Sequence, residues 1–406
     1  MKKHYLIIGG INPKDANRNR YSSFQLANQA ANSRWMWNLI NGLEHEGRTV
    51  TVLNTPNLPS YQEDKQTLIH EGYEWSHNGS SKDYAIEYNN IFPLSIVSRN
   101  IAISRYCNEW INNTEGDKII IGITPHFPIV NNLSLLSKKV KTCLIVPDLP
   151  DFTGTARMGN PFYKLLKNLD VKLFYSKIKH IENFIVLTDR MKERIGLEKR
   201  FLRIECMVDP NIANIDDNKD YFNDERKDGL LILYSGTIHK RYGLMEVAQA
   251  IRESDLHCKL LVCGGGPGVE SIVQISKEDK RIKYIGLLDP DEVIKLQRKS
   301  DILINPRPDD GSEYLHYSFP SKTLEYMAAS KPVVCHKLPG IPDEYDAYLI
   351  YLNNNSKDNI ISVLSSLMKM TEAEREIIGK RNVDFVLHKK NIFVQTKKII
   401  DFIEGH

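Results

Sequence analysis

The stretch FPSKTLEYMAASKPVV, residues 319–334, combines a turn, a short helix of small residues and a β-branched strand. Pro320 suits the first turn of a helix, and Ala328-Ala329 would let that helix pack closely on a sheet. In a parallel α/β domain such a helix starts at the carboxyl end of a strand, where its free N–H groups attract anions. The stretch therefore favours an anion-binding helix, although an ordinary helix start would show the same local residues.

Short apolar runs alternate with amphipathic stretches along almost the whole chain. Runs that are apolar on both faces predict buried parallel strands at 4–9, 48–54, 118–124, 142–148, 183–189, 203–209, 230–236, 259–265, 282–288, 301–306 and 331–337. Helical periodicity predicts helices at 28–46, 160–179, 241–253, 289–299, 320–330 and 391–405. The β-α-β order in both halves predicts an α/β fold with two Rossmann-like domains.

A chain of 406 residues is long enough for two domains. The polar segment 214–229 has the composition of a linker, so we place an N-terminal domain at 1–213 and a C-terminal domain at 230–385. A final helix within 386–406 is a candidate to pack back on the N-terminal domain. The stretch 55–95 is long for a loop, and loops of that length are usually functional or mobile.

Composition limits the classes of function. A net charge of +3 is too small for a nucleic-acid-binding protein, and the six cysteines include no CxxC pair. The apolar run near the N-terminus is too short for a signal peptide, and no stretch approaches the length needed to span a bilayer. We therefore expect a cytoplasmic protein that binds no nucleic acid.

The opening stretch has the chemistry of a nucleotide diphosphate cradle. Backbone N–H groups near Ser321 and Thr323, together with the Lys322 ammonium, are suited to phosphate oxygens. The carboxylate of Glu325, one turn further on, can accept hydrogen bonds from both hydroxyls of a ribose. We predict these four residues as part of a donor site.

Four segments, taken in order, carry a resemblance to a known family. They are YSGTIHKRYGL (234–244), LLVCGGGPGVESI (260–272), IKYIGLLDPDEVIKLQRKSDILINP (282–306) and YSFPSKTLEYMAASKPVV (317–334). Together they resemble the nucleotide-sugar domain of family 4 (group 1) glycosyltransferases, which are retaining enzymes of the GT-B fold. The resemblance is strong over about 110 residues and implies two Rossmann-like domains that face a central cleft.

The resemblance implies roles for individual residues of the C-terminal half. Glu325 is similar to the ribose-binding glutamate that closes the family's E-x7-E motif. Gly236 and Thr237 would approach the donor pyrophosphate, and Lys240 or Arg241 would supply positive charge there. Gly265 would belong to the turn beneath the nucleobase, with 285–287 near the base edge.

Two positions depart from the family pattern. The first glutamate of E-x7-E is Tyr317 here, so Glu313, Asp309 or Asp310 would have to contact the sugar instead. The usual arginine after the glycine is Thr237, and the resemblance then leaves Lys322 and Arg241 to stabilise the pyrophosphate.

The N-terminal half should hold the acceptor. Gly9-Gly10 resembles the family's glycine turn near the donor phosphate, with a plain turn as the alternative. His126 follows the predicted strand 118–124 and is a candidate catalytic group, with a capping role as the alternative. Asp148 and Asp151 are candidates to bind acceptor hydroxyls, or else they close local turns.

Basic residues are concentrated between Lys138 and Arg203, where fifteen Lys or Arg stand against seven Asp or Glu. The segment 160–180 interleaves large apolar side chains with basic ones, namely Phe162, Tyr163, Leu166, Leu173 and Phe174 with Lys164, Lys167, Lys172, Lys177 and Lys179. This pattern favours contact with an anionic membrane, and a core helix with a solvated lysine face is the alternative.

The sequence therefore predicts a retaining GT-B glycosyltransferase with His126, Lys322 and Arg241 as catalytic residues. Its donor would be a nucleotide diphosphate sugar, and its acceptor a lipid-linked glycan at the inner face of the plasma membrane. The resemblance also implies that the enzyme needs no cofactor or essential metal. A nucleotide-sugar epimerase and a non-catalytic partner subunit with the same fold are the alternatives.

Overall fold

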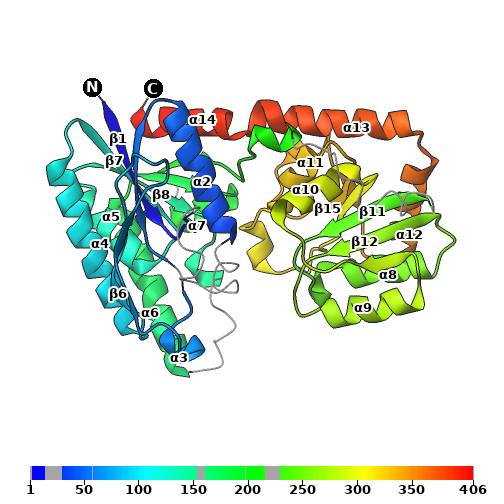
Figure 1. Cartoon of the computed structure of the whole chain (residues 1–406), viewed down its shortest axis with the longest axis horizontal. Coiled ribbons are helices and arrows are strands. Elements are labelled where there is room, and N and C mark those ends of the chain that lie inside the picture. Colours follow the sequence, from blue (N-terminus) through cyan, green and yellow to red (C-terminus); the bar gives the residue numbers. More distant parts are fainter. Residues whose placement is uncertain are drawn as a thin grey trace. The chain divides into compact units, whose positions relative to one another are not determined.

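The computed structural model describes residues 2–13, 30–56, 58–152, 161–196, 198–214 and 229–405 (Figure 1). The chain forms two compact units. Unit 1 contains Met1–Glu205 and Ile392–His406, and unit 2 contains Cys206–Asn391. Nearly all of the predicted linker 214–229 lies outside the described residues.

Unit 1 is built on an eight-stranded sheet. In spatial order its strands are β10 (Arg200–Arg203), β9 (Asn183–Val186), β8 (Lys141–Val146), β7 (Asp117–Ile123), β1 (Lys3–Gly9), β2 (Thr49–Asn54), β5 (Asp83–Ala85) and β4 (Tyr73–Trp75). β4 pairs antiparallel with β5, and the other neighbours pair in parallel. The chain order reverses between β1 and β7, which is the position where ligands bind in open parallel sheets.

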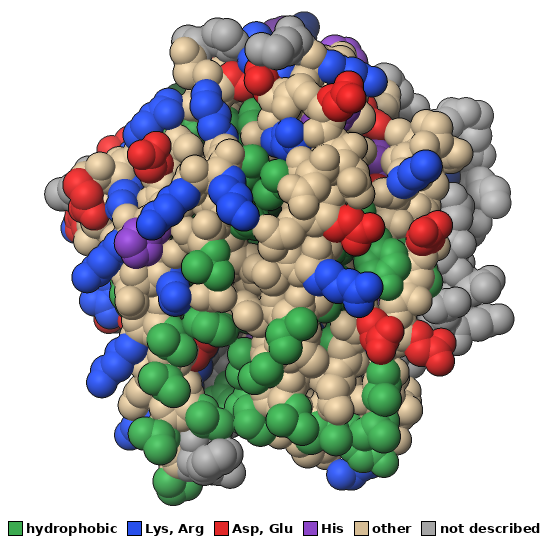
Figure 2. Space-filling view, turned by 90° about the vertical axis from the view of Figure 1, so that its left-hand side faces the viewer, with side chains coloured by type: hydrophobic (Ala, Val, Ile, Leu, Met, Phe, Trp, Pro, Cys, Tyr) green, Lys and Arg blue, Asp and Glu red, His purple; other side chains and the backbone are tan. Residues whose placement is uncertain are grey.

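The helices of unit 1 cover both faces of this sheet. They are α2 (Ala30–His45), α3 (Tyr61–Asp64), α4 (Leu94–Asn113), α5 (Phe127–Leu136), α6 (Pro161–Lys177), α7 (Arg190–Ile195) and α14 (Ile392–Glu404). α5 packs on β7 and β8 and contacts α4 and α6, whereas α2 packs on β2 and α14 (Figure 1). The side of Figure 1 on which α4 and α5 lie faces the viewer in Figure 2.

Unit 2 is a six-stranded, all-parallel sheet with helices. Its strands in spatial order are β13 (Ile282–Tyr284), β12 (Cys258–Cys263), β11 (Leu230–Ser235), β14 (Ile302–Asn305), β15 (Val333–His336) and β16 (Ile350–Leu352). Its helices are α8 (Leu244–Arg252), α9 (Val269–Glu278), α10 (Pro290–Lys299), α11 (Lys322–Ala328), α12 (Lys357–Lys369) and α13 (Glu372–Phe385). Here the chain order reverses between β11 and β14.

Ten of the eleven predicted strands contain an observed strand, but the one at 203–209 was wrong. The strand lies earlier, at β10, and within 204–209 only Val208 pairs, in a single bridge to Asn391. β16 was not predicted, because three residues are too few to show a periodicity.

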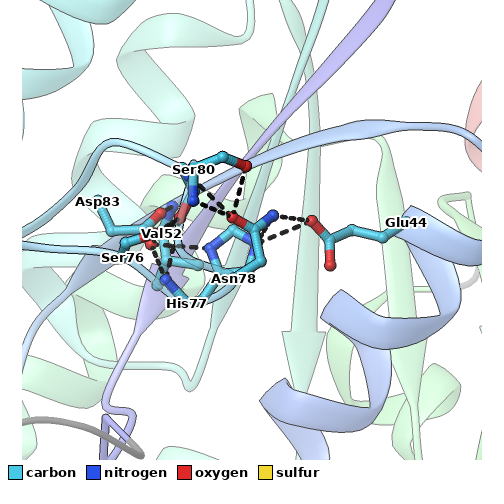
Figure 3. A network of polar contacts seen from close by, with 8 residues as sticks. Glu44, Val52, Ser76, His77, Asn78, Ser80 and Asp83 are labelled. Carbon is cyan, nitrogen blue, oxygen red and sulfur yellow. Dashed lines mark hydrogen bonds and ion pairs between the residues drawn. The ribbon is translucent and has the colours of Figure 1, made fainter.

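The stretch 55–95 is ordered where it is described. β3 (Ile69–His70) pairs antiparallel with β6 (Tyr88–Asn89), and β4 and β5 extend the main sheet. A buried polar network fixes the connection between β4 and β5 (Figure 3). The His77 ring lies 2.8 Å from Asp83 Oδ2 and 3.0 Å from Glu44 Oε1, and Val52 N donates to Asp83 Oδ1. Burial acts to lower the pKa of His77, but the hydrogen bonds and charges of Asp83 and Glu44 outweigh it and raise that pKa.

The last helix, α14, is held on unit 1 by a buried carboxylate. The Glu404 side chain is 1% exposed and accepts hydrogen bonds from Tyr5 Oη at 2.8 Å and from Arg48 Nε at 2.9 Å and Nη2 at 3.0 Å. Lys3 forms a further ion pair with it. A buried carboxylate with this many charged partners is stable only while the full set is present, because removing one partner leaves an uncompensated charge.

Three further contacts support the docking of α14. Lys141 Nζ donates to Glu404 O, and Arg200 Nη2 donates to Phe402 O, so cations meet the carbonyl end of the helix. Gly42 of α2 lies so close to Thr396 that a Cβ at position 42 would come within 2.1 Å of the Thr396 hydroxyl oxygen.

We expect Glu404→Gln to lower the free energy of unfolding of unit 1 by about 3 kcal/mol at pH 7, the magnitude for a broken buried ion pair. Burial acts to raise the pKa of Glu404, but hydrogen bonds from Arg48, Lys3 and Tyr5 lower it to about 2. Because the folded pKa lies below the ordinary 4.5, the carboxylate stabilises the fold above pH 4.5, and this contribution is lost as the pH falls toward 2.

Urea unfolding at pH 7 and at pH 3 measures both effects. Asp401→Asn on the same helix is the control, because its exposed pair with Lys397 contributes little. Equal unfolding midpoints for Glu404→Gln and Asp401→Asn would contradict the expectation.

Candidate functional site

The turns after β11 and β12 lie in backbone contact at the carboxyl edge of unit 2. Gly236 N donates to Cys263 O at 3.0 Å, and Ile238 N donates to Gly265 O at 2.8 Å. Gly264 has φ +137°, and a Cβ there would lie 1.8 Å from Gly236 O. Only glycine fits at 264, so the sequence GGG fixes the close approach of the two turns.

A polar cluster connects β11 to α11 at the point where the chain order reverses. Glu325 Oε1 accepts hydrogen bonds from Lys322 Nζ at 2.7 Å and from Gln297 Nε2 at 2.8 Å. Gln297 Nε2 also lies 3.0 Å from Ser235 Oγ, and Ser235 N donates to Tyr326 Oη at 2.7 Å. The Glu325 side chain is 13% exposed, so this ordered carboxylate can still be reached from solvent.

Gln297 was not predicted from the sequence. It lies on α10, whose start is set by Pro290 and by a capping box between Asp289 and Glu292, and the helix buries it completely. Its amide nitrogen donates to Glu325 and to Ser235 and so holds both side chains. Its amide oxygen has no hydrogen-bond partner among the described residues, which is costly for a buried polar atom. The signal in the sequence was one polar residue on the inward face of an amphipathic helix.

α11 begins two residues later than the predicted helix at 320–330. Ser321 is exposed just before it, whereas Thr323 is fully buried and its N–H donates to Pro320 O at 2.8 Å. The Thr323 side chain therefore faces the interior. Ser321 and Lys322 are the accessible residues of the predicted cradle.

Three cationic side chains lie at the same edge. Lys240 and Arg241 are exposed in a 3₁₀ turn just before α8. Arg307, which the sequence did not reveal, follows β14, and its guanidinium lies 5.0 Å from the Tyr242 ring centre and 5.7 Å from that of Tyr314. The exposed Thr237 accepts a hydrogen bond on its backbone oxygen from Tyr234 Oη.

Tyr317, which stands where the family has a glutamate, donates a hydrogen bond to Glu313 Oε1 at 3.1 Å. Asp309 and Asp310 instead cap the following backbone, since they accept from Gly311 N and Ser312 N. Of the three acidic residues considered as replacements, Glu313 is the one joined to Tyr317.

In unit 1, Gly9 is the last residue of β1 and His126 follows β7. These are the two strands between which the chain order reverses. Gly9 ends β1, and a Cβ there would lie 2.8 Å from Met36 Sδ and 3.2 Å from Ile123 Cβ. Gly10 follows directly. His126 precedes α5, after Thr124, whose φ of +85° is costly for a β-branched residue. This strained turn sets the direction in which the chain leaves β7.

The environment of His126 keeps its ring neutral. The residue retains exposed surface, but the protein around the ring withdraws enough water to lower its pKa to about 4, and the positive charge of Arg99 acts in the same direction. At pH 7 His126 is therefore an uncharged imidazole that can donate one hydrogen bond and accept another.

The two aspartates after β8 differ. Asp151 Oδ2 accepts from Tyr175 Oη at 2.7 Å and Oδ1 accepts from Arg194 Nη2 at 3.0 Å, so it ties α6 and α7 to the end of β8. This geometry gives Asp151 a structural role. Asp148 is half-buried in the turn before it.

The apolar side chains singled out in 160–180 mostly face inward. Phe174 is buried, Tyr163, Leu166 and Leu173 are half-buried, and the Phe162 side chain lies outside the described residues. The strongly exposed apolar side chains of α6 are instead Leu165 and Leu169.

Two absences apply to the described part of the chain. Within it, no group of three His, Cys, Asp or Glu is placed to hold a metal ion. No helix in it is long and apolar enough to cross a bilayer.

Each Rossmann-like unit brings predicted site residues to the point where its chain order reverses, and two such units are the architecture of the GT-B fold. Residues 229–369 match the family model of glycosyl transferases group 1, so this part of the chain is a group 1 glycosyltransferase domain. The predicted fold, family and enzyme class are thereby confirmed. No curated protein matches the chain.

Solved structures show the same fold over the whole chain. A trehalose-6-phosphate protein from E. coli bound with UDP-2-fluoro glucose is similar with a TM-score of 0.68, at 10% identity over 99% of both chains. A trehalose-phosphate synthase from Burkholderia xenovorans in complex with glucose-6-phosphate is similar with a TM-score of 0.66, at 10% identity over 98% of this chain and 99% of that one. HepE from Anabaena in complex with UDP gives 0.65, at 10% identity over 100% of both.

We expect Gln297→Met, which keeps length and volume but removes the amide, to raise the dissociation constant for a nucleotide-sugar donor about tenfold, or about 1.4 kcal/mol. Without the amide, Glu325 loses one of the groups that orient it. Calorimetry measures the affinity, and the exposed Gln249→Met is the matched control. Unchanged affinity in a folded Gln297→Met protein would show that the amide does not position Glu325.

Proposed function

We propose that this protein transfers a sugar from a UDP-sugar to a glycan acceptor with retention of configuration. The observation that carries the proposal is the cluster of Lys322, Glu325 and Gln297 at the reversal point of unit 2, inside the segment that matches group 1 glycosyl transferases. UDP is the nucleotide in two of the similar structures, and this supports it as the donor nucleotide.

The residues of unit 2 suit the donor half of the reaction. Glu325 accepts hydrogen bonds from the ribose hydroxyls, and Lys322 meets the diphosphate, to which Arg241, Lys240 or Arg307 adds positive charge. The bond between the sugar C1 and the phosphate oxygen breaks as the acceptor oxygen bonds to C1 on the same face. The acceptor proton passes to the departing phosphate, whose developing charge these cations stabilise.

The residues of unit 1 suit the sugar and the acceptor. A neutral His126 can hydrogen bond to a sugar hydroxyl without placing a positive charge beside a cationic transition state. Gly10, which is half-buried directly after β1, is the residue of this turn that can approach a phosphate, because Gly9 is packed against Met36 and Ile123. Asp148 is the remaining acidic candidate for acceptor hydroxyls. We propose that no metal or cofactor takes part, which activity retained in EDTA would support.

The acceptor in this proposal is a lipid-linked surface glycan, and the enzyme works in the cytoplasm at the inner face of the plasma membrane. The basic segment 160–180 supports this choice over a sugar phosphate. Thermal unfolding with UDP-, GDP-, dTDP- and ADP-sugars identifies the donor, since a bound ligand raises stability. Transfer from that donor to a lipid diphosphate sugar, compared with glucose-6-phosphate, then tests the acceptor class.

We expect Glu325→Ala to weaken UDP-sugar binding by about 1.5–3 kcal/mol, because a charged hydrogen-bond acceptor is lost from the ribose. Calorimetry measures the loss, and circular dichroism checks the fold. The control is Glu376→Ala, an exposed glutamate on α13. If Glu325→Ala binds the donor as tightly as the control does, the ribose assignment is wrong.

We expect His126→Ala to lower kcat about a hundredfold and to leave donor affinity nearly unchanged, since a contact made in the transition state is lost. Steady-state kinetics with calorimetry separates the two parameters. His180→Ala, an exposed histidine of the same unit, is the control. A kcat equal to that of wild type would show that His126 has no catalytic role, since its side chain makes no cap hydrogen bond either.

A further inference from the structure

Exposed apolar side chains are concentrated on one part of unit 1. Of the ten large apolar side chains that are strongly exposed among the described residues, eight belong to unit 1. Six of them lie on three helices, namely Leu94, Val97, Ile101, Leu135, Leu165 and Leu169. Figure 2 shows apolar side chains gathered across the lower part of this face, with Lys and Arg mostly above and to the left.

The three helices run in parallel and nearly in register. α4, α5 and α6 each precede a strand of the parallel series β7, β8 and β9. Asn131 donates to Asn100, and Lys139 donates to Asn108. In both pairs the two residues are 31 positions apart, so α4 and the α5 segment lie side by side in one register. The rings of Phe92 and Tyr163 lie 6.3 Å apart, which brings the starts of α4 and α6 together.

The exposed stripe of each helix begins with apolar residues and continues with charged ones. On α4 it begins with Leu94, Val97 and Ile101 and continues with Arg105 and Glu109. On α5 the exposed Leu135 is followed by the exposed Lys138 and Lys139.

On α6 the stripe begins with Leu165 and Leu169 and continues with the exposed Lys172 and, beyond the helix, Lys179. Because α4, α5 and α6 are parallel, the exposed apolar side chains of α4 and α6 lie toward the N-terminal ends of the helices, and most of the exposed basic side chains lie toward the C-terminal ends. Leu135, which is level with Ser104, and Lys164 at the start of α6 lie outside this division.

The exposed charge of this face is almost all positive. Arg105, Lys138, Lys139, Lys164, Lys172 and Lys179 are exposed, whereas Glu109 is the one exposed acidic residue within 94–113, 135–139 and 161–180, all of which the structure describes. Lys167 Nζ lies 3.3 Å from Asp170 Oδ2, and this ion pair leaves Lys167 little part in the positive charge of the face. An apolar area beside a basic one matches the acyl boundary and anionic headgroups of a membrane.

We infer that the face formed by α4, α5 and α6 is the membrane-docking surface of this protein, with Leu94, Val97, Ile101, Leu165 and Leu169 inserted and the basic residues on anionic headgroups. The charge favours this occupant over a second copy of the chain, whose identical basic face would repel it. The inference rests on the proposed function in one respect: a lipid-linked acceptor explains why the enzyme would dock on a membrane.

Co-sedimentation of the full chain with vesicles tests the inference without any sugar substrate. We expect the protein to pellet with vesicles that contain phosphatidylglycerol, and to do so less with pure phosphatidylcholine or in 0.5 M salt. The double variants Val97→Ser with Ile101→Ser, and Leu165→Ser with Leu169→Ser, should each lower the partition constant at least tenfold. Replacing Lys138, Lys172 and Lys179 with glutamine should lower it about fivefold per residue.

Ile377→Ser is the matched control, because Ile377 is equally exposed but lies on α13 of unit 2. UDP affinity, measured in every variant without vesicles, should stay at the wild-type value, so loss of docking and failure of the proposed donor site are separate results. The inference is overturned if the wild type does not pellet with anionic vesicles, or if the serine variants pellet like Ile377→Ser. A concentration-dependent dimer that only the serine variants abolish would also overturn it.

Discussion

The buried carboxylate of Glu404 is the interaction on which the organisation of the chain depends. It joins the last helix to β1 through Lys3 and Tyr5, and to the start of β2 through Arg48. β1 and α14 therefore both belong to unit 1 and contact each other there. Unit 2 is inserted in the sequence between β10 and α14. Desolvating a carboxylate is costly, so its full set of cationic and hydroxyl partners makes one docking position of α14 much more stable than others.

The site of unit 2 is organised before any ligand binds. Glu325 is held by Lys322 and Gln297, and Gln297 is itself fixed to Ser235 at the end of β11. A carboxylate already oriented loses little conformational entropy when a ribose arrives. The ion pair of Lys322 with Glu325 has a further effect on binding. When ribose hydroxyls hydrogen bond to the carboxylate, the Lys322 ammonium can turn from Glu325 to the diphosphate.

The sequence was informative where a pattern is long or chemically specific. Strands buried on both faces are continuous apolar runs, so ten of the fourteen strands described in the two sheets were predicted. The glycine turns with Glu325 indicated where the donor edge lies. Gln297, Arg307 and Glu404 were missed because each acts through residues far away in the chain, as in the 399 positions that separate Glu404 from Tyr5. The exposed face of α6 was misjudged because periodicity gives the width of an apolar stripe, whereas neighbouring helices decide which part of it is covered.

The insertion of unit 2 has a consequence for synthesis of the protein. Its first and last residues lie side by side, as Val208 N donates to Lys390 O and Val208 bridges to Asn391. All strands and helices of unit 2 emerge from the ribosome before α14 does, so this unit can complete its core while unit 1 still lacks a helix. The second half of the chain thus finishes folding first, and α2 presents the surface around Gly42 without its partner until the final residues emerge.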